Sequence, residues 1–305
     1  MTRAIVLGLL IGAGALSIGV AAFQAPPAAP SPTAIGAAAM VKVRDNLYVV
    51  TGSTPDTPTF SGGNTVVFIT ATGVVVVDTK LPGWGPALLD RIKSVTNKPI
   101  AMIINTHSHF DHSGSNEFFG ATVDTVVHEH TRANMARMPE FSGPKAAFLP
   151  KRTFKDMMTL GSGKDQIDLY YFGPGHTGGD AWVVFPALRA MHVGDLFPRK
   201  DLPFADLGNG GSVVHFAETI SKGLAGIRDV DTVIGGHQAV TTPAAMKEYA
   251  SFNRDFVAWA QGEKKAGKSV DQAAAEYKTP AKYAGYSVPQ AAKIKRNTQA
   301  VYDGK

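Results

Sequence analysis

The chain has 305 residues, of which 44% are hydrophobic and 18% are charged, and it contains no cysteine. This composition is typical of a globular protein with one large domain and a smaller extension, and it excludes an intrinsically disordered chain. A disulfide framework and a lipid-modified cysteine are also excluded, because both need a thiol. The net charge of +5 is concentrated in residues 254–305, which hold ten basic and five acidic side chains. No basic run is interleaved with aromatic residues, so a solvated helical surface is favoured and no nucleic-acid partner is expected.

The first 22 residues have the pattern of a cleavable signal peptide. Arg3 precedes an apolar run, and the small residues Ala21 and Ala22 follow it. The run is short and rich in glycine, which favours cleavage over a membrane anchor. We therefore predict that residues 1–22 are removed and that the protein is secreted, to the periplasm, with no stable membrane anchor afterwards. Residues 23–40 are rich in alanine and proline and are predicted to form an extended, disordered linker.

Strands and helices alternate from residue 41 onward. Strands are predicted at 41–50, 64–70 and 74–78, and the valine run of the third is typical of a strand covered on both faces. A helix at 86–95 has its apolar residues on one side, and a buried strand follows at 99–106. Further strands are predicted at 125–127, 167–172, 182–185, 191–193 and 232–234, and further helices at 131–137, 212–227 and 243–260.

Strand-rich runs with helices between them indicate a layered α/β fold in which helices cover sheets. We predict a catalytic domain over residues 41–252. Residues 253–305 are rich in alanine and lysine and contain no strand pattern. They are predicted to form a basic helical C-terminal extension.

Three histidines and one aspartate follow the predicted strand at 99–106 within six residues: His107, His109, Asp111 and His112. The carboxyl ends of strands are where α/β folds place their sites. Alternate residues of an extended segment point the same way, so His107, His109 and Asp111 can converge while His112 turns toward a neighbouring point. Imidazole nitrogen and carboxylate oxygen are ligands that zinc accepts in catalytic sites. Because burying this cluster without a metal would be costly, the stretch predicts a metal site.

This stretch has the HxHxDH pattern of the metallo-β-lactamase superfamily, and four further segments are similar to that family in order and spacing. They are the strand-end Asp78, the GHT loop at 175–177, the GD strand end at 194–195 and the GH pair at 236–237. The resemblance covers residues 41–249. It implies a four-layer αβ/βα sandwich with the site at one edge.

The resemblance also implies two Zn²⁺ ions per chain, held by seven ligands. The first ion would be bound by His107, His109 and His176, the second by Asp111, His112 and His237, and both by Asp195.

Two-metal chemistry in such a site implies a zinc-dependent hydrolase. A hydroxide bridging the two ions would be the nucleophile, with Asp111 and Asp195 as the catalytic carboxylates. The ions would polarise the substrate carbonyl and stabilise the leaving group. For Asp78 two interpretations are open: a partner that orients the metal loop, or a turn residue at a strand end.

Three other histidines are interpreted without a metal. His128 and His130 lack a following aspartate and begin a helix, so they are expected to be structural or surface residues. His192 alternates with apolar residues in a strand and is expected to be packed.

Local features favour a β-lactam or a related cyclic amide or ester, carrying an anionic group, as the substrate. Arg199 and Lys200 follow the GD motif and are candidate contacts for a carboxylate, or else they face water. Asn209, in a Gly-Asn loop similar to that of zinc β-lactamases, is a candidate donor to the reacting carbonyl oxygen. Phe60 lies near the tip of the loop at 54–63, where those enzymes carry a mobile flap.

Two departures bear on the choice of substrate. Asp195 stands where one β-lactamase subclass has cysteine, and an aspartate there gives the ligand set of glyoxalases and lactonases. Pro198 stands where quorum-signal lactonases have tyrosine, which argues against that kind of lactonase. A thioesterase or lactonase of the same superfamily is therefore an alternative. A metal-free binding protein that keeps the fold is an alternative of another class. The filled ligand set argues against it, and metal content would discriminate.

Overall fold

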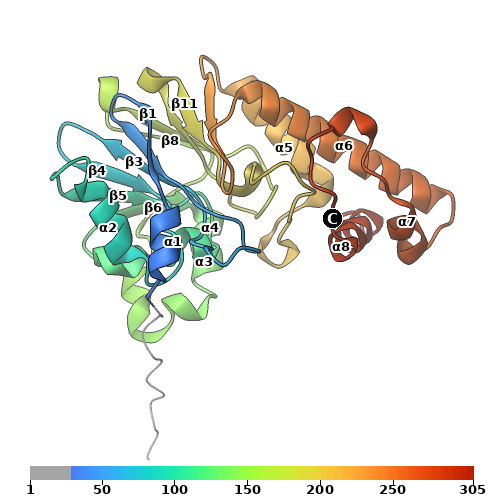
Figure 1. The fold of residues 1–305 in the computed structure, drawn as a ribbon, viewed down its shortest axis with the longest axis horizontal. Helices are drawn as coiled ribbons and strands as arrows, with labels where there is room; N and C mark the ends of the chain where they lie inside the picture. The colour runs from blue at the N-terminus through green and yellow to red at the C-terminus, as the bar shows by residue number, and fades with distance from the viewer. Residues whose placement is uncertain (1–28) are drawn as a thin grey trace, which may run out of the picture.

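The structure, a computed structural model, describes residues 29–305 (Figure 1). The predicted signal peptide lies outside the described residues. Within the predicted linker, α1 (Pro32–Ala37) is a helix and not an extended segment. Ser31 caps it, and Ala34 packs into the cluster that covers the first sheet. The linker prediction is therefore wrong here, because a capping serine followed by proline begins a helix even in an Ala/Pro-rich segment.

The first sheet has seven strands whose spatial order follows the chain. They are β1 (Met40–Arg44), β2 (Leu47–Val50), β3 (Thr65–Ile69), β4 (Val74–Val77), β5 (Ile100–Ile104), β6 (Asp124–His128) and β7 (Arg152–Phe154). Pairing is antiparallel from β1 to β4 and parallel from β4 to β7. The single strand expected at 41–50 is a hairpin, because Asp45 and Asn46 form a tight turn between β1 and β2.

The second sheet has five strands, in the order β12-β11-β10-β9-β8. They are β8 (Met157–Leu160), β9 (Ile167–Tyr170), β10 (Trp182–Phe185), β11 (Ala190–His192) and β12 (Thr232–Ile234). Only the β11–β12 pair of this sheet is parallel. β7 and β8 have no counterpart in the sequence prediction, because both are short and partly exposed and so lack a continuous apolar run.

Helices cover the outer faces of both sheets, and an apolar core lies between the sheets (Figure 1). In β4, Val74 and Val76 pack with Leu88 of α2 (Gly85–Lys93), whereas Val75 and Val77 share the inter-sheet core with Val183. The second sheet is covered by α5 (Val213–Gly226) and α6 (Pro243–Lys265). This is the predicted four-layer αβ/βα sandwich, and the valine run is covered on both faces as expected.

The C-terminal segment is helical and packs on the outer side of the second sheet. α6 continues through residue 252, the expected end of the catalytic domain, and is followed by α7 (Val270–Glu276) and α8 (Ala291–Tyr302). Ile294 and Val301 of α8 belong to the same apolar cluster as Phe252 and Trp182. Among residues 29–305, no helix combines the length and the apolar character that crossing a bilayer needs.

Candidate metal centre

The seven predicted ligands converge from loops at one edge of the two sheets. His107 and His109 follow β5, Asp111 and His112 lie on α3 (Phe110–Ser113), His176 lies between β9 and β10, Asp195 follows β11, and His237 follows β12. The extended segment thus ends at His109, and Asp111 belongs to the helical turn together with His112. The first sheet supplies four of the ligands and the second sheet supplies three.

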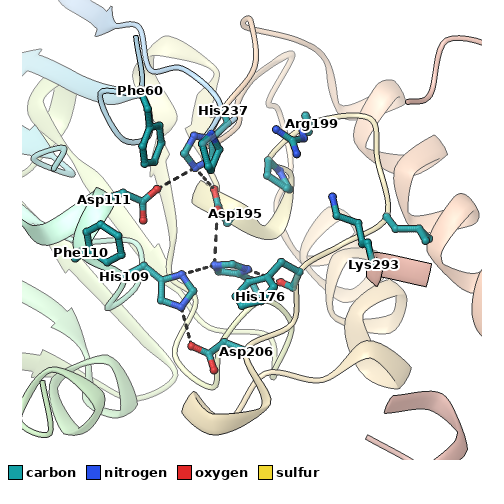
Figure 2. Close-up of a pocket in the computed structure, with 14 residues that line it drawn as sticks. Phe60, His109, Phe110, Asp111, His176, Asp195, Arg199, Asp206, His237 and Lys293 are labelled. Carbon is teal, nitrogen blue, oxygen red and sulfur yellow. Dashed lines mark hydrogen bonds and ion pairs between the residues drawn. The ribbon is translucent and has the colours of Figure 1, made fainter. Parts of the chain in front are cut away.

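One group consists of His107, His109 and His176, with ligand atoms within 4.8 Å of one another. His109 Nδ1 lies 2.9 Å from His176 Nε2 (Figure 2). Burial, together with His112 and His176, holds the pKa of His107 well below its usual value, and burial with His109 lowers the pKa of His176 to about 4. Both rings are therefore neutral at pH 7, the state in which imidazole binds a metal.

A second group consists of Asp111, His112 and His237. His237 Nε2 lies 3.3 Å from Asp111 Oδ2 and 3.3 Å from His112 Nε2. Burial opposes protonation of His237, but the carboxylates of Asp195 and Asp111 raise its pKa to about 9. Because a ligating histidine must be neutral, metal binding here would release a proton.

Asp195 stands between the two groups. Its Oδ1 lies 3.5 Å from His112 Nε2 and 3.4 Å from His237 Nε2, and its Oδ2 lies 3.6 Å from His176 Nε2. One oxygen faces each group, as a bridging ligand requires (Figure 2). Gly236 permits this approach, because a Cβ there would lie 1.8 Å from Asp195 Oδ1.

Every ligand histidine is held by a hydrogen bond to its outer ring nitrogen, which leaves the inner nitrogen facing the site. The outer partners are Thr106 Oγ1 for His107, Asp206 for His109, Asp78 for His112, the Phe204 carbonyl for His176 and the Ser53 carbonyl for His237. Such partners fix ring orientation in metal sites.

Two buried atoms at the centre test whether the residues fit a metal. Nε2 of His107 and Oδ1 of Asp195 have no hydrogen-bond partner among the described residues. Buried polar atoms are normally paired, and leaving them unpaired is costly. Ions held by the two groups would satisfy both atoms, and the nitrogen and oxygen donors suit zinc.

Asp78 orients the metal loop, which decides between its two sequence interpretations. It is fully buried and accepts hydrogen bonds from the backbone and hydroxyl of Thr106, both at 2.8 Å. Its Oδ2 lies 2.7 Å from His112 Nδ1 and 3.3 Å from His192 Nε2. Burial opposes ionisation, but His112 and His192 hold the pKa of Asp78 at about 2. His192 is buried as expected, in contact with this carboxylate.

Asp206 plays the corresponding part for His109 and was not found from the sequence. Its Oδ2 lies 2.8 Å from His109 Nε2, and this contact holds the pKa of Asp206 well below its usual range. Asn209 donates to the same carboxylate oxygen from Nδ2 at 2.7 Å. The expected donation from Asn209 to a substrate carbonyl is therefore corrected: its amide is engaged behind the site, and it does not line the cavity.

A cavity of about 470 Å³ opens over the two groups. Phe60 and Arg199 line it, as expected (Figure 2). Lys200 does not, and this expectation is also corrected. Its ammonium points away from the cavity, 3.2 Å from Glu248 and above the ring of Tyr286.

The remaining histidines of interest lie outside both groups. His128 Nε2 donates to the Lys155 carbonyl at 2.8 Å, and its ring stacks on Tyr171. His130 Nδ1 lies 2.7 Å from the Gly178 carbonyl. Both are structural contacts.

The fold and this site define a metallo-hydrolase. The family model of the metallo-β-lactamase superfamily matches residues 58–253, and the chain belongs to that family. A metallo-β-lactamase type 2 of Elizabethkingia meningoseptica is 29% identical to this chain, in an alignment that covers 64% of this chain and 77% of the relative. A metallo-β-lactamase structure from Pontibacter korlensis has a TM-score of 0.60 at 20% identity, covering 71% of this chain and 98% of that one.

A second structural likeness reaches further along the chain. An inverting sec-alkylsulfatase from Pseudomonas sp. has a TM-score of 0.67 at 17% identity, covering 88% of this chain and 50% of that one. The 88% of this chain that is covered is more than residues 58–253 make up. The shared fold therefore extends beyond the region that the family model matches.

Proposed function

We propose that this chain is a dinuclear-zinc hydrolase that cleaves a cyclic amide or ester, with β-lactam-like small molecules as the first candidate substrates. The observation that carries the proposal is the pair of three-ligand groups joined by Asp195 at the base of the cavity. The named activity of the Elizabethkingia relative supports the choice of substrate.

Bound zinc ions would supply Lewis acidity and lower the pKa of a coordinated water toward neutrality. The chain's own residues do the rest of the work. Asp111 lies beside His237 at the cavity wall, where its carboxylate can accept a hydrogen bond from the attacking water and hold it in line. Phe60 and Phe110 offer apolar surface for the substrate and exclude bulk water.

Metal content and turnover test this proposal together. We expect two zinc equivalents per chain, hydrolysis of at least one member of a panel of β-lactams, lactones and thioesters, loss of turnover on chelation, and recovery with zinc. An active protein without metal would contradict the two-metal mechanism. A protein that takes up no metal and hydrolyses none of these compounds would support the metal-free binding protein instead.

We also propose that the mature enzyme works in the periplasm after removal of residues 1–22. The support is the charged start, the apolar run and the small residues that follow it. N-terminal sequencing of the exported protein should begin at Phe23. An intact N-terminus on the exported protein would contradict cleavage and favour an anchored form.

A further inference from the structure

The C-terminal helix α8 reaches the active-site cavity. Lys293, in its first turn, is a lining residue although it lies outside the region that the family model matches. In Figure 2, Lys293 and Arg199 stand on one side of the cavity, and Phe60 and Phe110 stand on the other.

A single buried carboxylate holds both cations in place. Asp201 forms an ion pair with Lys293, and its Oδ2 lies 3.6 Å from Arg199 Nη2. Asp201 is 6% exposed and also accepts a hydrogen bond from the Leu202 backbone. Two cations thus share one buried anion, which leaves one positive charge in excess at this wall. Arg199 has one further contact, 3.5 Å from Asp56, but Asp56 is exposed and such pairs are weak.

The rest of α8 fixes the loop that carries these groups. Asn297 is buried and donates to the Pro203 carbonyl at 3.0 Å. The Arg296 guanidinium lies over the Phe204 ring, at 4.5 Å from its centroid, and that ring packs against His109 and His176. α8 is therefore connected to both the cationic wall and the first ligand group.

We propose that Lys293 and Arg199 form the anion-binding end of the substrate cavity, so that α8 determines substrate specificity. The other lining residues include Phe60, Phe110, Leu202 and Phe204. The cavity therefore fits an amphiphilic substrate, with an apolar body against these side chains and an anionic group at the cationic wall. An anion there would be partly shielded from water, because the Lys293 and Arg199 side chains are only 19% and 27% exposed. This inference rests on the proposed hydrolase function.

The test compares Lys293→Met with Lys295→Met in the zinc-loaded enzyme. Lys295 lies on the same helix, but its ammonium pairs with the exposed Asp271 away from the cavity. The substrates are a chromogenic cephalosporin with a free carboxylate and its methyl ester. We expect Lys293→Met to raise KM for the acid about tenfold, the value of one charge-assisted hydrogen bond, and to leave KM for the ester and both kcat values near parental. Lys293→Arg should restore KM, and Lys295→Met should change nothing.

Equal KM changes for acid and ester, or no change for either, would overturn the inference while the hydrolase proposal stands. If the parent enzyme hydrolyses neither compound, the β-lactam proposal fails, and calorimetry with 4-phenylbutyrate and its neutral amide decides the inference. Parental enzyme should bind the carboxylate more tightly than the amide, and Lys293→Met should remove that preference. A preference that survives in Lys293→Met, or the lack of any preference in the parent, would overturn the proposal.

Discussion

The ligand histidines are positioned by residues that belong to neither ligand group. Asp78 and Asp206 each hold one ring by its outer nitrogen, at 2.7 and 2.8 Å. Four of the candidate ligands could be predicted from their spacing, because they lie within six residues after one strand, and the resemblance to the family implied the other three. Asp206 could not be found this way. It lies 97 positions after its partner His109, and only the folded loop brings the two together.

Gly236 gives a sharp test of the bridging position. A Cβ at this residue would collide with Asp195 Oδ1, so Gly236→Ala should displace the carboxylate from between the two groups. We expect weaker binding of the second zinc and a fall in turnover of at least about tenfold, as for disturbed contacts around a metal. Titration against a chromogenic chelator measures both affinities.

Gly262→Ala is the matched control, because nothing lies within 4 Å of its Cβ in α6. The control should bind zinc normally and gain up to about 1 kcal/mol of stability from higher helix propensity. Unchanged zinc binding in Gly236→Ala would mean that Asp195 does not bridge.

At the level of single elements, the junction of β6 and α4 (Glu129–Met135) depends on a neutral histidine. His128 caps α4 by accepting from the His130 backbone at Nδ1, and it donates from Nε2 to Lys155. The capping bond needs the uncharged ring, because a protonated Nδ1 cannot accept, whereas the bond to Lys155 is kept when the ring is protonated. Burial and the nearby His130 lower the pKa of His128 to about 4.

This low pKa predicts a pH-dependent loss of stability. The unfolded chain takes up the proton near pH 6.5, and the folded chain does so only near pH 4. The contribution of His128 is therefore complete above pH 6.5 and is lost as the pH falls from 6.5 to 4. His128→Asn keeps a capping side chain but does not titrate.

Urea unfolding of wild type and His128→Asn, each with its metal removed by a chelator, measures the effect at pH 7.5 and pH 4.5. We expect wild type to lose stability relative to His128→Asn at the lower pH. A constant difference between the two proteins would show that His128 is protonated equally in the folded and unfolded chains.

Elements with a strong periodic pattern were predicted with correct type, and the weaker ones were not. The valine run of β4 and the apolar side of α2 are decided locally, because burial on both faces or on one face is visible in the sequence. α1, β7 and β8 are short and were missed. β7 is fixed by parallel pairing with β6, a contact that the residues of β7 do not encode by themselves.

For the whole molecule, the C-terminal helices are part of the core and not an appendage. Ile294 of α8 is 8% exposed in the cluster that also holds Trp182 of the second sheet. Ile294→Ala should lower the free energy of unfolding by about 2–4 kcal/mol, because it leaves a cavity in that cluster. Val288 is 91% exposed, and Val288→Ala should cost less than about 0.5 kcal/mol.

Tryptophan fluorescence and retained zinc should report the same unfolding transition. Ile294→Ala should lower its midpoint equally for both probes. Two separate transitions, in which Ile294→Ala leaves the midpoint of zinc release unchanged, would show that residues 253–305 fold as an independent unit.

The same packing explains which substrate contacts were mispredicted. Lys200 was chosen because it follows the GD motif closely, and Asn209 because its Gly-Asn loop resembles that of zinc β-lactamases. Their side chains instead turn to Glu248 and Asp206. Lys293 reaches the cavity from 92 positions beyond its partner Asp201. Sequence proximity predicts ligands on a strand-end loop well, because the loop is short, but it does not predict contacts made by a distant helix.

The division of the ligands between the two sheets has a mechanical consequence. His109 comes from the first sheet and His176 from the second, and the same is true of His112 and Asp195. Each zinc ion would therefore crosslink the two sheets of the sandwich at their shared edge. Removing the ions should let the two sheets move relative to each other, so that amide hydrogens of β4 and β11 exchange faster than they do in the zinc-loaded protein. Conversely, substitutions deep between the sheets, far from any ligand, should alter how tightly the metals are held.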